Sequence, residues 1–302
     1  MEESSFLQNI AIDQKYGVQL NVLRLDLLHP VIQGNKYFKL LYNLEYASRE
    51  NKVIITMGGP YSNHLYACAL ACNSEKIPSY GIVRGTHFKF LSPTLQRCKD
   101  LGMQLLFIDR VLFREIRDCK DFIPFIPQLE TYGIAIPNNI HFIPEGGSNA
   151  LGILGAQEIL ENISLEFDYV FVPVGTGGTL SGIINYTQGE KIILGVSIIK
   201  DEYLVNTVKD ITKNKFDNWQ INFNYHFGGY AKWNLTLIDF INKFKKDYQI
   251  PLCPIYTGKM MFGIFDLLEN HYFPKGSSLL AIHTGGIQGI EGFNQTNNNI
   301  LN

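Results

Sequence analysis

The chain of 302 residues lacks the features of a membrane protein or a nucleic-acid-binding protein. No apolar run approaches the ~20 residues that a membrane-spanning helix needs. Charged residues make up only 18% of the chain and the net charge is −2, so we expect no general attraction to nucleic acid or to an anionic membrane. The first five residues are acidic and polar, without the apolar core of an export signal.

The cysteines are also few, and their spacing fits neither a disulfide framework nor a structural zinc site. There are five, an odd number, scattered along the chain. Cys68 and Cys72 lie four residues apart in an alanine-rich segment, which indicates buried packing on a helix. We therefore expect no metal and a reducing, cytoplasmic location.

What the sequence does have is a large apolar content in alternating strand and helix patterns. Hydrophobic residues make up 46% of the chain, enough for one large or two ordinary domains. Strands that are continuous apolar runs, alternating with helices, predict an α/β fold with mostly parallel sheets. In such sheets ligands bind at the carboxyl ends of the strands. The predicted strands are residues 53–57, 79–83, 104–108, 141–144, 169–174, 191–197 and 279–283.

A glycine-rich segment follows the strand predicted at 169–174. It reads Gly175-Thr176-Gly177-Gly178-Thr179, and a helix is predicted from about Leu180. Backbone N–H groups, two hydroxyls and the positive end of a helix make a cradle for phosphate. No Gly-Lys-Ser/Thr follows, and Leu180 stands where the dinucleotide fingerprint has its last glycine. The pattern favours a monophosphate guest, with a glycine-rich turn that binds nothing as the alternative.

Lys36 is the candidate nucleophile. It lies in the segment from Gln33 to Lys39, just before a periodic apolar run that predicts a helix. A lysine in buried or cationic surroundings can lose its proton, and the neutral amine can form a Schiff base with a carbonyl. On the local sequence alone, a solvated surface lysine is the alternative.

Ser62-Asn63-His64 lies where a strand and a Gly-Gly-Pro turn lead into a helix. Asn63 could hydrogen-bond a ring hydroxyl or a carboxylate, and Ser62 could deliver or take a proton. An ordinary helix N-cap is the alternative. We interpret His64 as a packing histidine.

Three further hydroxyl residues follow apolar segments. Tyr230 and Tyr256 lie beside glycines in predicted loops, where a phenol can act as an acid or base if its pKa is lowered. Thr284 follows the last strand, where its hydroxyl could face a heterocyclic nitrogen. Packing residues and a simple turn are the alternatives, and we interpret His283 as structural.

Together these motifs resemble the family of pyridoxal-phosphate (PLP) enzymes that contains D-cysteine desulfhydrase and 1-aminocyclopropane-1-carboxylate (ACC) deaminase. The resemblance implies fold type II, the tryptophan synthase β-like fold, with two three-layer αβα domains and parallel sheets. Residues 1–43 with 150–302 would form the large PLP-binding domain, and 44–149 a small inserted domain. The matching segments are His29-Pro30, residues 34–36, 58–64, 84–85, 92–95, 144–149, 175–179, 256–259 and 284–286.

The resemblance also implies a role for each matched residue. Lys36, rather than the nearby Lys39, would hold PLP covalently. The remaining cofactor contacts would be Asn63 to the pyridine hydroxyl, Gly175, Thr176, Gly177, Gly178 and Thr179 to the phosphate, and Thr284 to the pyridine nitrogen.

The catalytic residues that the resemblance implies are Lys36, Ser62, Tyr256 and Tyr230. Ser62 would contact the substrate carboxylate or assist proton transfer, and the tyrosines would line the active site. ACC deaminases typically carry Glu after the active-site tyrosine, whereas this chain has Thr257, as desulfhydrases do.

We therefore expect β-elimination from a small D-amino acid, most favourably D-cysteine to pyruvate, sulfide and ammonia, by a homodimer. ACC deamination to 2-oxobutyrate, β-replacement, and a non-catalytic phosphate-ligand binding protein stay open as alternatives.

Overall fold

The computed structural model describes residues 6–29, 32–86, 90–133, 135–161 and 163–301. Pro30 of the His29-Pro30 motif and the acidic residues 1–5 lie outside these ranges. The chain divides into two units, Met1–Phe38 with Ile153–Asn302 and Lys39–Gly152. One boundary falls inside helix α1 (Asn35–Arg49), whose apolar periodicity runs through it. The predicted division into 1–43 with 150–302 and 44–149 falls close to these limits and stays a prediction.

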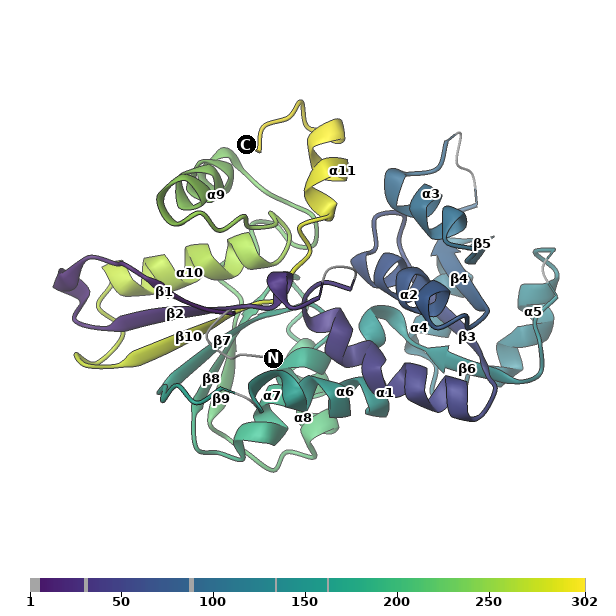
Figure 1. Cartoon of the computed structure of the whole chain (residues 1–302), viewed down its shortest axis with the longest axis horizontal. Coiled ribbons are helices and arrows are strands. Elements are labelled where there is room, and N and C mark those ends of the chain that lie inside the picture. The colour runs from purple at the N-terminus through teal and green to yellow at the C-terminus, as the bar shows by residue number, and fades with distance from the viewer. Residues whose placement is uncertain (1–5, 30–31, 87–89, 134, 162, 302) are drawn as a thin grey trace. The chain divides into compact units, whose positions relative to one another are not determined.

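The first unit is built on a sheet for which the described residues give six strands. Their order across the sheet is β1-β2-β10-β7-β8-β9 (Figure 1). β1 runs antiparallel to β2, and the other neighbours pair in parallel. The predicted strands of this unit are all present. β9, a short half-buried strand containing Gln220 and Asn222, gave no apolar signal. The strands are β1 Leu7–Ile10, β2 Gln19–Arg24, β7 Tyr169–Val174, β8 Ile192–Ser197, β9 Trp219–Asn222 and β10 Ser278–His283.

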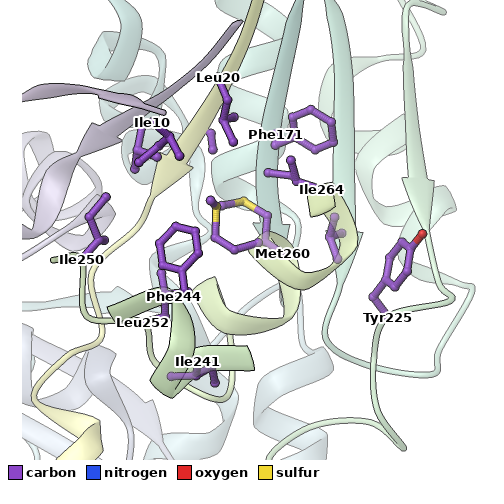
Figure 2. Packing of buried hydrophobic residues seen from close by; sticks show 14 of the residues in the cluster. Ile10, Leu20, Phe171, Tyr225, Ile241, Phe244, Ile250, Leu252, Met260 and Ile264 are labelled. Atoms are coloured by element: carbon purple, nitrogen blue, oxygen red, sulfur yellow. The ribbon is translucent and has the colours of Figure 1, made fainter. Parts of the chain in front are cut away.

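Both faces of this sheet are covered, which explains the continuous apolar strands. In β10, Leu279 and Ala281 pack into one hydrophobic cluster, and Leu280 and Ile282 pack into another on the opposite face. Figure 2 shows the first cluster, where Met260 and other helical residues lie below the strands. The sheet is therefore the middle of three layers. Its helices are α7 Gly178–Thr187 and α8 Leu204–Thr212 at the second cluster, and α9 Leu235–Tyr248 and α10 Thr257–Glu269 at the first. Two further helices are α6 Ala150–Gln157 and α11 Gly289–Thr296.

The second unit has a four-stranded parallel sheet in the order β5-β4-β3-β6. Ile55 and Met57 of β3 pack with Phe113 of α4 on one face. On the other face, a Cβ at Gly81 would lie 2.7 Å from Met103 Sδ and 3.3 Å from Leu65 of α2, so glycine makes room for both side chains. The elements are β3 Val53–Gly58, β4 Ser79–Arg84, β5 Gln104–Ile108, β6 Ile140–Ile143, α2 Asn63–Ser74, α3 Pro93–Asp100, α4 Arg110–Asp118 and α5 Ile126–Glu130.

Short 3-10 turns join several of these elements. η3 (Leu25–Leu27) directly follows β2 and leads toward the loop before Lys36. Among the described residues, no helix has the length and apolarity needed to cross a membrane. The other 3-10 turns are η2 Gln14–Tyr16, η4 Ile123–Phe125, η5 Glu145–Gly147 and η6 Glu158–Leu160.

Candidate active site

Lys36 lies in the first turn of α1, and the loop before it is fixed by backbone hydrogen bonds. The N–H of Gly34 donates to the carbonyl of Leu25 at 2.9 Å, and the N–H of Asn35 donates to the carbonyl of Thr284 at 3.3 Å. Gly34 has φ +72°, and a Cβ there would collide with the Thr284 carbonyl group, 2.5 Å from its carbon. Only glycine fits this position without a shift of the backbone. The loop thus ties the start of α1 to the turn after β10.

Asn35 connects Lys36 to the glycine-rich loop. Its buried Nδ2 donates to Thr179 Oγ1 at 2.7 Å, and its Oδ1 accepts from Lys36 Nζ at 3.4 Å. Three predicted features, the lysine, the phosphate cradle and the turn at Thr284, therefore meet at one asparagine. The sequence analysis did not single out Asn35, although it stands between two matched residues of the Gly-Asn-Lys motif.

Burial lowers the pKa of Lys36 to about 8. Removing water from around an ammonium disfavours its charged form, so a larger share of the amine is neutral near pH 7 to 8 than for a lysine in water. Lys39 lies in the second unit, where its Nζ donates to Ser148 Oγ at 3.0 Å. Lys36, the lysine that the sequence analysis selected, lies in the first unit together with the glycine-rich loop.

The glycine-rich loop connects the end of β7 to the start of α7. Gly177 is the N-cap of α7, with φ +82°, and has no side chain to cap the first N–H groups. The first N–H groups of a helix have no partner within the helix, so this end can bind an anion. Thr179 is buried, whereas Thr176 is exposed. The donor set fits a phosphate group.

Tyr256 lies at the N-terminus of α10, beside this loop. A Cβ at Gly175 would lie 3.3 Å from the Tyr256 ring, so glycine makes room for the phenol. The rings of Tyr256 and Tyr230 are 6.4 Å apart at 76°, an edge-to-face arrangement. The structure thus brings Lys36, the glycine loop, Thr284 and the tyrosine pair into one unit.

Thr257 is buried and its hydroxyl points back into its own turn. The Oγ1 atom accepts the N–H of Cys253 at 2.9 Å, and the N–H of Tyr256 donates to Cys253 Sγ at 3.2 Å. Thr257 therefore fixes the turn that presents Tyr256.

Thr284 directly follows β10, whose last residue, His283, belongs to a buried charged network. His283 Nδ1 donates to Asp26 Oδ1 at 2.9 Å, and His283 Nε2 lies 2.8 Å from the Pro251 carbonyl oxygen. Arg24 donates two hydrogen bonds to Asp26, at 2.9 and 2.7 Å. Burial alone would raise the pKa of Asp26, but these hydrogen bonds hold it well below its usual range. The network fixes the strand ends behind Thr284, in agreement with a structural role for His283.

Ser62 and Asn63 belong to the second unit. Ser62 is the N-cap of α2, where its Oγ accepts the N–H of Leu65 at 3.2 Å, and Asn63 is the first residue of that helix. His64 is buried, with Nε2 2.8 Å from Thr56 Oγ1, which donates to the Ile143 carbonyl. This geometry fits the interpretation of Ser62 as a helix N-cap and of His64 as a packing histidine. Their roles toward a cofactor or substrate stay predictions.

Among the described residues, no group of three His, Cys, Asp or Glu side chains is placed to hold a metal ion. The polar groups gathered around Lys36 are amide, hydroxyl and backbone groups, which suit an organic phosphate ligand better than a cation.

The chain matches the family described as pyridoxal-phosphate dependent enzymes over residues 6–285, so it belongs to that family. It is an enzyme that uses PLP, and its fold is the type II fold of α/β units with mostly parallel sheets.

Several relatives of this chain within the family carry the names of two activities, ACC deaminase and D-cysteine desulfhydrase. It is 28% identical to a putative 1-aminocyclopropane-1-carboxylate deaminase of Pyrococcus horikoshii, over 94% of this chain and 89% of the relative. It is 28% identical to the mitochondrial bifunctional D-cysteine desulfhydrase/1-aminocyclopropane-1-carboxylate deaminase of Arabidopsis thaliana, over 91% of this chain and 74% of that protein. The solved structure of an ACC deaminase homologue covers 98% of this chain and 93% of that chain, with a TM-score of 0.78 and 25% identity.

Proposed function

We propose that this PLP enzyme catalyses β-elimination from a small D-amino acid, with D-cysteine as the best candidate. The observation that carries the proposal is the placement of Lys36. Its pKa is lowered to about 8, and Asn35 links it to the loop that would receive the cofactor phosphate. A binding protein without catalysis would need no amine linked to its phosphate loop in this way.

The residues of the first unit fit PLP. Gly175, Thr176, Gly177, Gly178 and Thr179 would hold its phosphate, Lys36 its aldehyde carbon, and the Thr284 hydroxyl its pyridine nitrogen. When bound, PLP supplies an electron sink for negative charge at the substrate Cα. A neutral hydroxyl at the pyridine nitrogen makes that sink weaker than a carboxylate partner would, which suits elimination because the leaving group takes up the charge.

Residues of this chain would carry the protons and orient the substrate. The neutral Lys36 amine would take the proton from the substrate Cα, and Ser62 would contact the substrate carboxylate or assist this transfer. Asn63 would orient the ring through its hydroxyl, and Tyr256 and Tyr230 would line the substrate pocket. The Cβ–S bond breaks with loss of sulfide, and the three-carbon enamine that remains reacts with water to give pyruvate and ammonia.

ACC deamination is the second candidate, because several relatives carry that name. The residue after Tyr256 favours elimination. The Thr257 hydroxyl is buried and accepts the Cys253 N–H, whereas ACC deaminases typically have a longer glutamate at this position.

The test is the visible absorption spectrum of the purified protein with PLP, followed as D-cysteine and then ACC are added. The proposal expects a yellow band that shifts with D-cysteine and recovers as sulfide appears, and Lys36→Ala should lack it. A band that responds to ACC alone would replace the substrate with the second candidate. No band in the wild type would refute the site assignment.

We also propose a homodimer in the cytoplasm, on the basis of the family resemblance. Light scattering of the purified chain would test the oligomeric state, and a monomeric mass at working concentration would reject it.

A further inference from the structure

A buried lysine outside the proposed chemistry lies one helical turn after Tyr256. Lys259 is fully buried in α10, and its Nζ donates to the carbonyls of His226 and Gly229, each at 2.8 Å. A buried ammonium is costly unless hydrogen bonds replace its water. The two carbonyls belong to the loop that carries Tyr230, so this contact connects the helix of one tyrosine to the loop of the other.

That loop, residues 223–234, has an unusual backbone. Phe227, Gly228, Gly229 and Ala231 all have positive φ, at 52°, 96°, 113° and 55°. Side-chain-bearing residues such as Phe227 and Ala231 rarely adopt this conformation, and strained backbone persists only where its surroundings impose it. The loop therefore needs an external support.

The support comes from α10. Tyr225 Oη donates to Asp266 at 2.8 Å, and the Phe227 ring packs edge-to-face on Phe262 at 5.0 Å. Lys259 makes a third contact between α10 and the loop. It lies nearer the N-terminus of α10 than Phe262 and Asp266, and it binds the part of the loop next to Tyr230. The other two contacts lie farther from the tyrosine pair.

We propose that Lys259 is a positioning residue that holds the 226–229 carbonyls and thereby fixes Tyr230 against Tyr256. The inference rests on the proposed function, because it concerns the tyrosine pair of that site. Burial also lowers the pKa of Lys259 to about 8, because removing water from around an ammonium disfavours its charged form.

The first test is chymotrypsin cleavage of the full-length protein, read by mass spectrometry at Phe227 and Tyr230. Lys259→Met should raise cleavage at these sites at least about tenfold, because loops open more often when their anchoring contacts are lost. Lys232→Met, an exposed lysine in the same loop, is the matched control and should stay within about twofold. Equal cleavage in wild type and Lys259→Met would overturn the proposal.

The second test is a double-mutant cycle on kcat/KM. Lys259→Met should lower kcat/KM roughly 10- to 100-fold in the wild type, but less than about threefold in a Tyr230→Phe background, since residues that act together are not additive. Lys259→Gln, whose amide can still donate, should recover part of the loss. Additive losses would overturn the proposal.

A second perturbation covers the case in which Lys259→Met does not fold. Gly229→Ala keeps the Lys259 side chain but strains, at φ +113°, the residue whose carbonyl accepts its hydrogen bond, and it should reproduce both the cleavage and the non-additive kinetics. If the wild type turns over neither D-cysteine nor ACC, the proposed function fails. The cleavage assay alone then decides whether Lys259 holds the loop.

Discussion

Replacing Gly34 with alanine separates a steric requirement at the active-site loop from an ordinary backbone preference. At φ +72° any residue with a Cβ is strained, and here the added Cβ would also meet the Thr284 carbonyl group, with its carbon at 2.5 Å and Gly285 Cα at 2.9 Å. Gly276 has φ +89° and nothing within 4 Å of its added Cβ. Gly276→Ala is therefore a control with the backbone penalty alone.

The expected magnitudes follow from these two positions. The left-handed conformation costs a non-glycine residue ~1–2 kcal/mol, so Gly276→Ala should lower the free energy of unfolding by about that amount. Gly34→Ala must in addition move the Thr284 turn, a backbone shift that costs ~1 kcal/mol or more, and weaken the hydrogen bond from the Asn35 N–H, which contributes ~1 kcal/mol. We expect a total loss of about 3–4 kcal/mol for Gly34→Ala, at the upper end of single substitutions.

The assay is thermal unfolding of both variants beside the wild type, in the absence of added PLP. An extra loss of about 2 kcal/mol should lower Tm by about 4–8 °C more in Gly34→Ala than in Gly276→Ala. A second readout is the yellow band after PLP addition, which should weaken only in Gly34→Ala because that loop places Lys36. Equal Tm values and equal bands in the two variants would refute the steric argument.

Three further predictions concern neighbouring contacts. The rate at which PLP reacts with Lys36 should rise with pH up to about 8 and level off above it, because only the neutral amine attacks and its pKa is lowered to about 8. Stopped-flow absorbance would measure this rate, and a rise that continues to pH 10 would contradict the effect of burial. Asn35→Ala should weaken PLP binding about tenfold, since it removes the bond to Thr179, worth ~1 kcal/mol or more, and unchanged affinity by fluorescence titration would exclude this role. Thr257→Val should lower the free energy of unfolding by ~1–3 kcal/mol, because it leaves the buried Cys253 N–H without its acceptor, whereas Thr257→Ser should retain most of the stability. Equal Tm values for the two variants would argue against a role of the Thr257 hydroxyl in fixing the turn.

Features that depend on consecutive residues were predictable from the sequence. The strand ending at Val174, the glycines after it and the helix that starts at Gly178 form one continuous segment, and its order alone predicts a phosphate cradle. The N-terminus of α3, with Ser92 as its cap and Pro93 in the first turn, likewise depends on consecutive residues. The short strand β9 was missed because its half-buried, polar residues carry no apolar run.

Contacts between distant residues were not predictable from local patterns. Asn35 and Thr179 are 144 positions apart, and no local pattern connects them until β10 and β7 pair in the sheet. The Arg24–Asp26–His283 network depends in the same way on the parallel register that sets His283 opposite Arg24. Motifs could place the separate chemical groups, but only the sheet registers bring them together.

Lys259 shows why a buried charge can be informative even when it performs no chemistry. In the sequence it is the last residue of Tyr-Thr-Gly-Lys, and its charge suggests a surface position. The fold instead buries it and gives it two main-chain carbonyls as partners. An apolar residue would fill the same space without the desolvation cost, but it could not hold a strained loop by its carbonyls. The cost of burying this amine is therefore best explained by the conformation it imposes on the loop beside Tyr230.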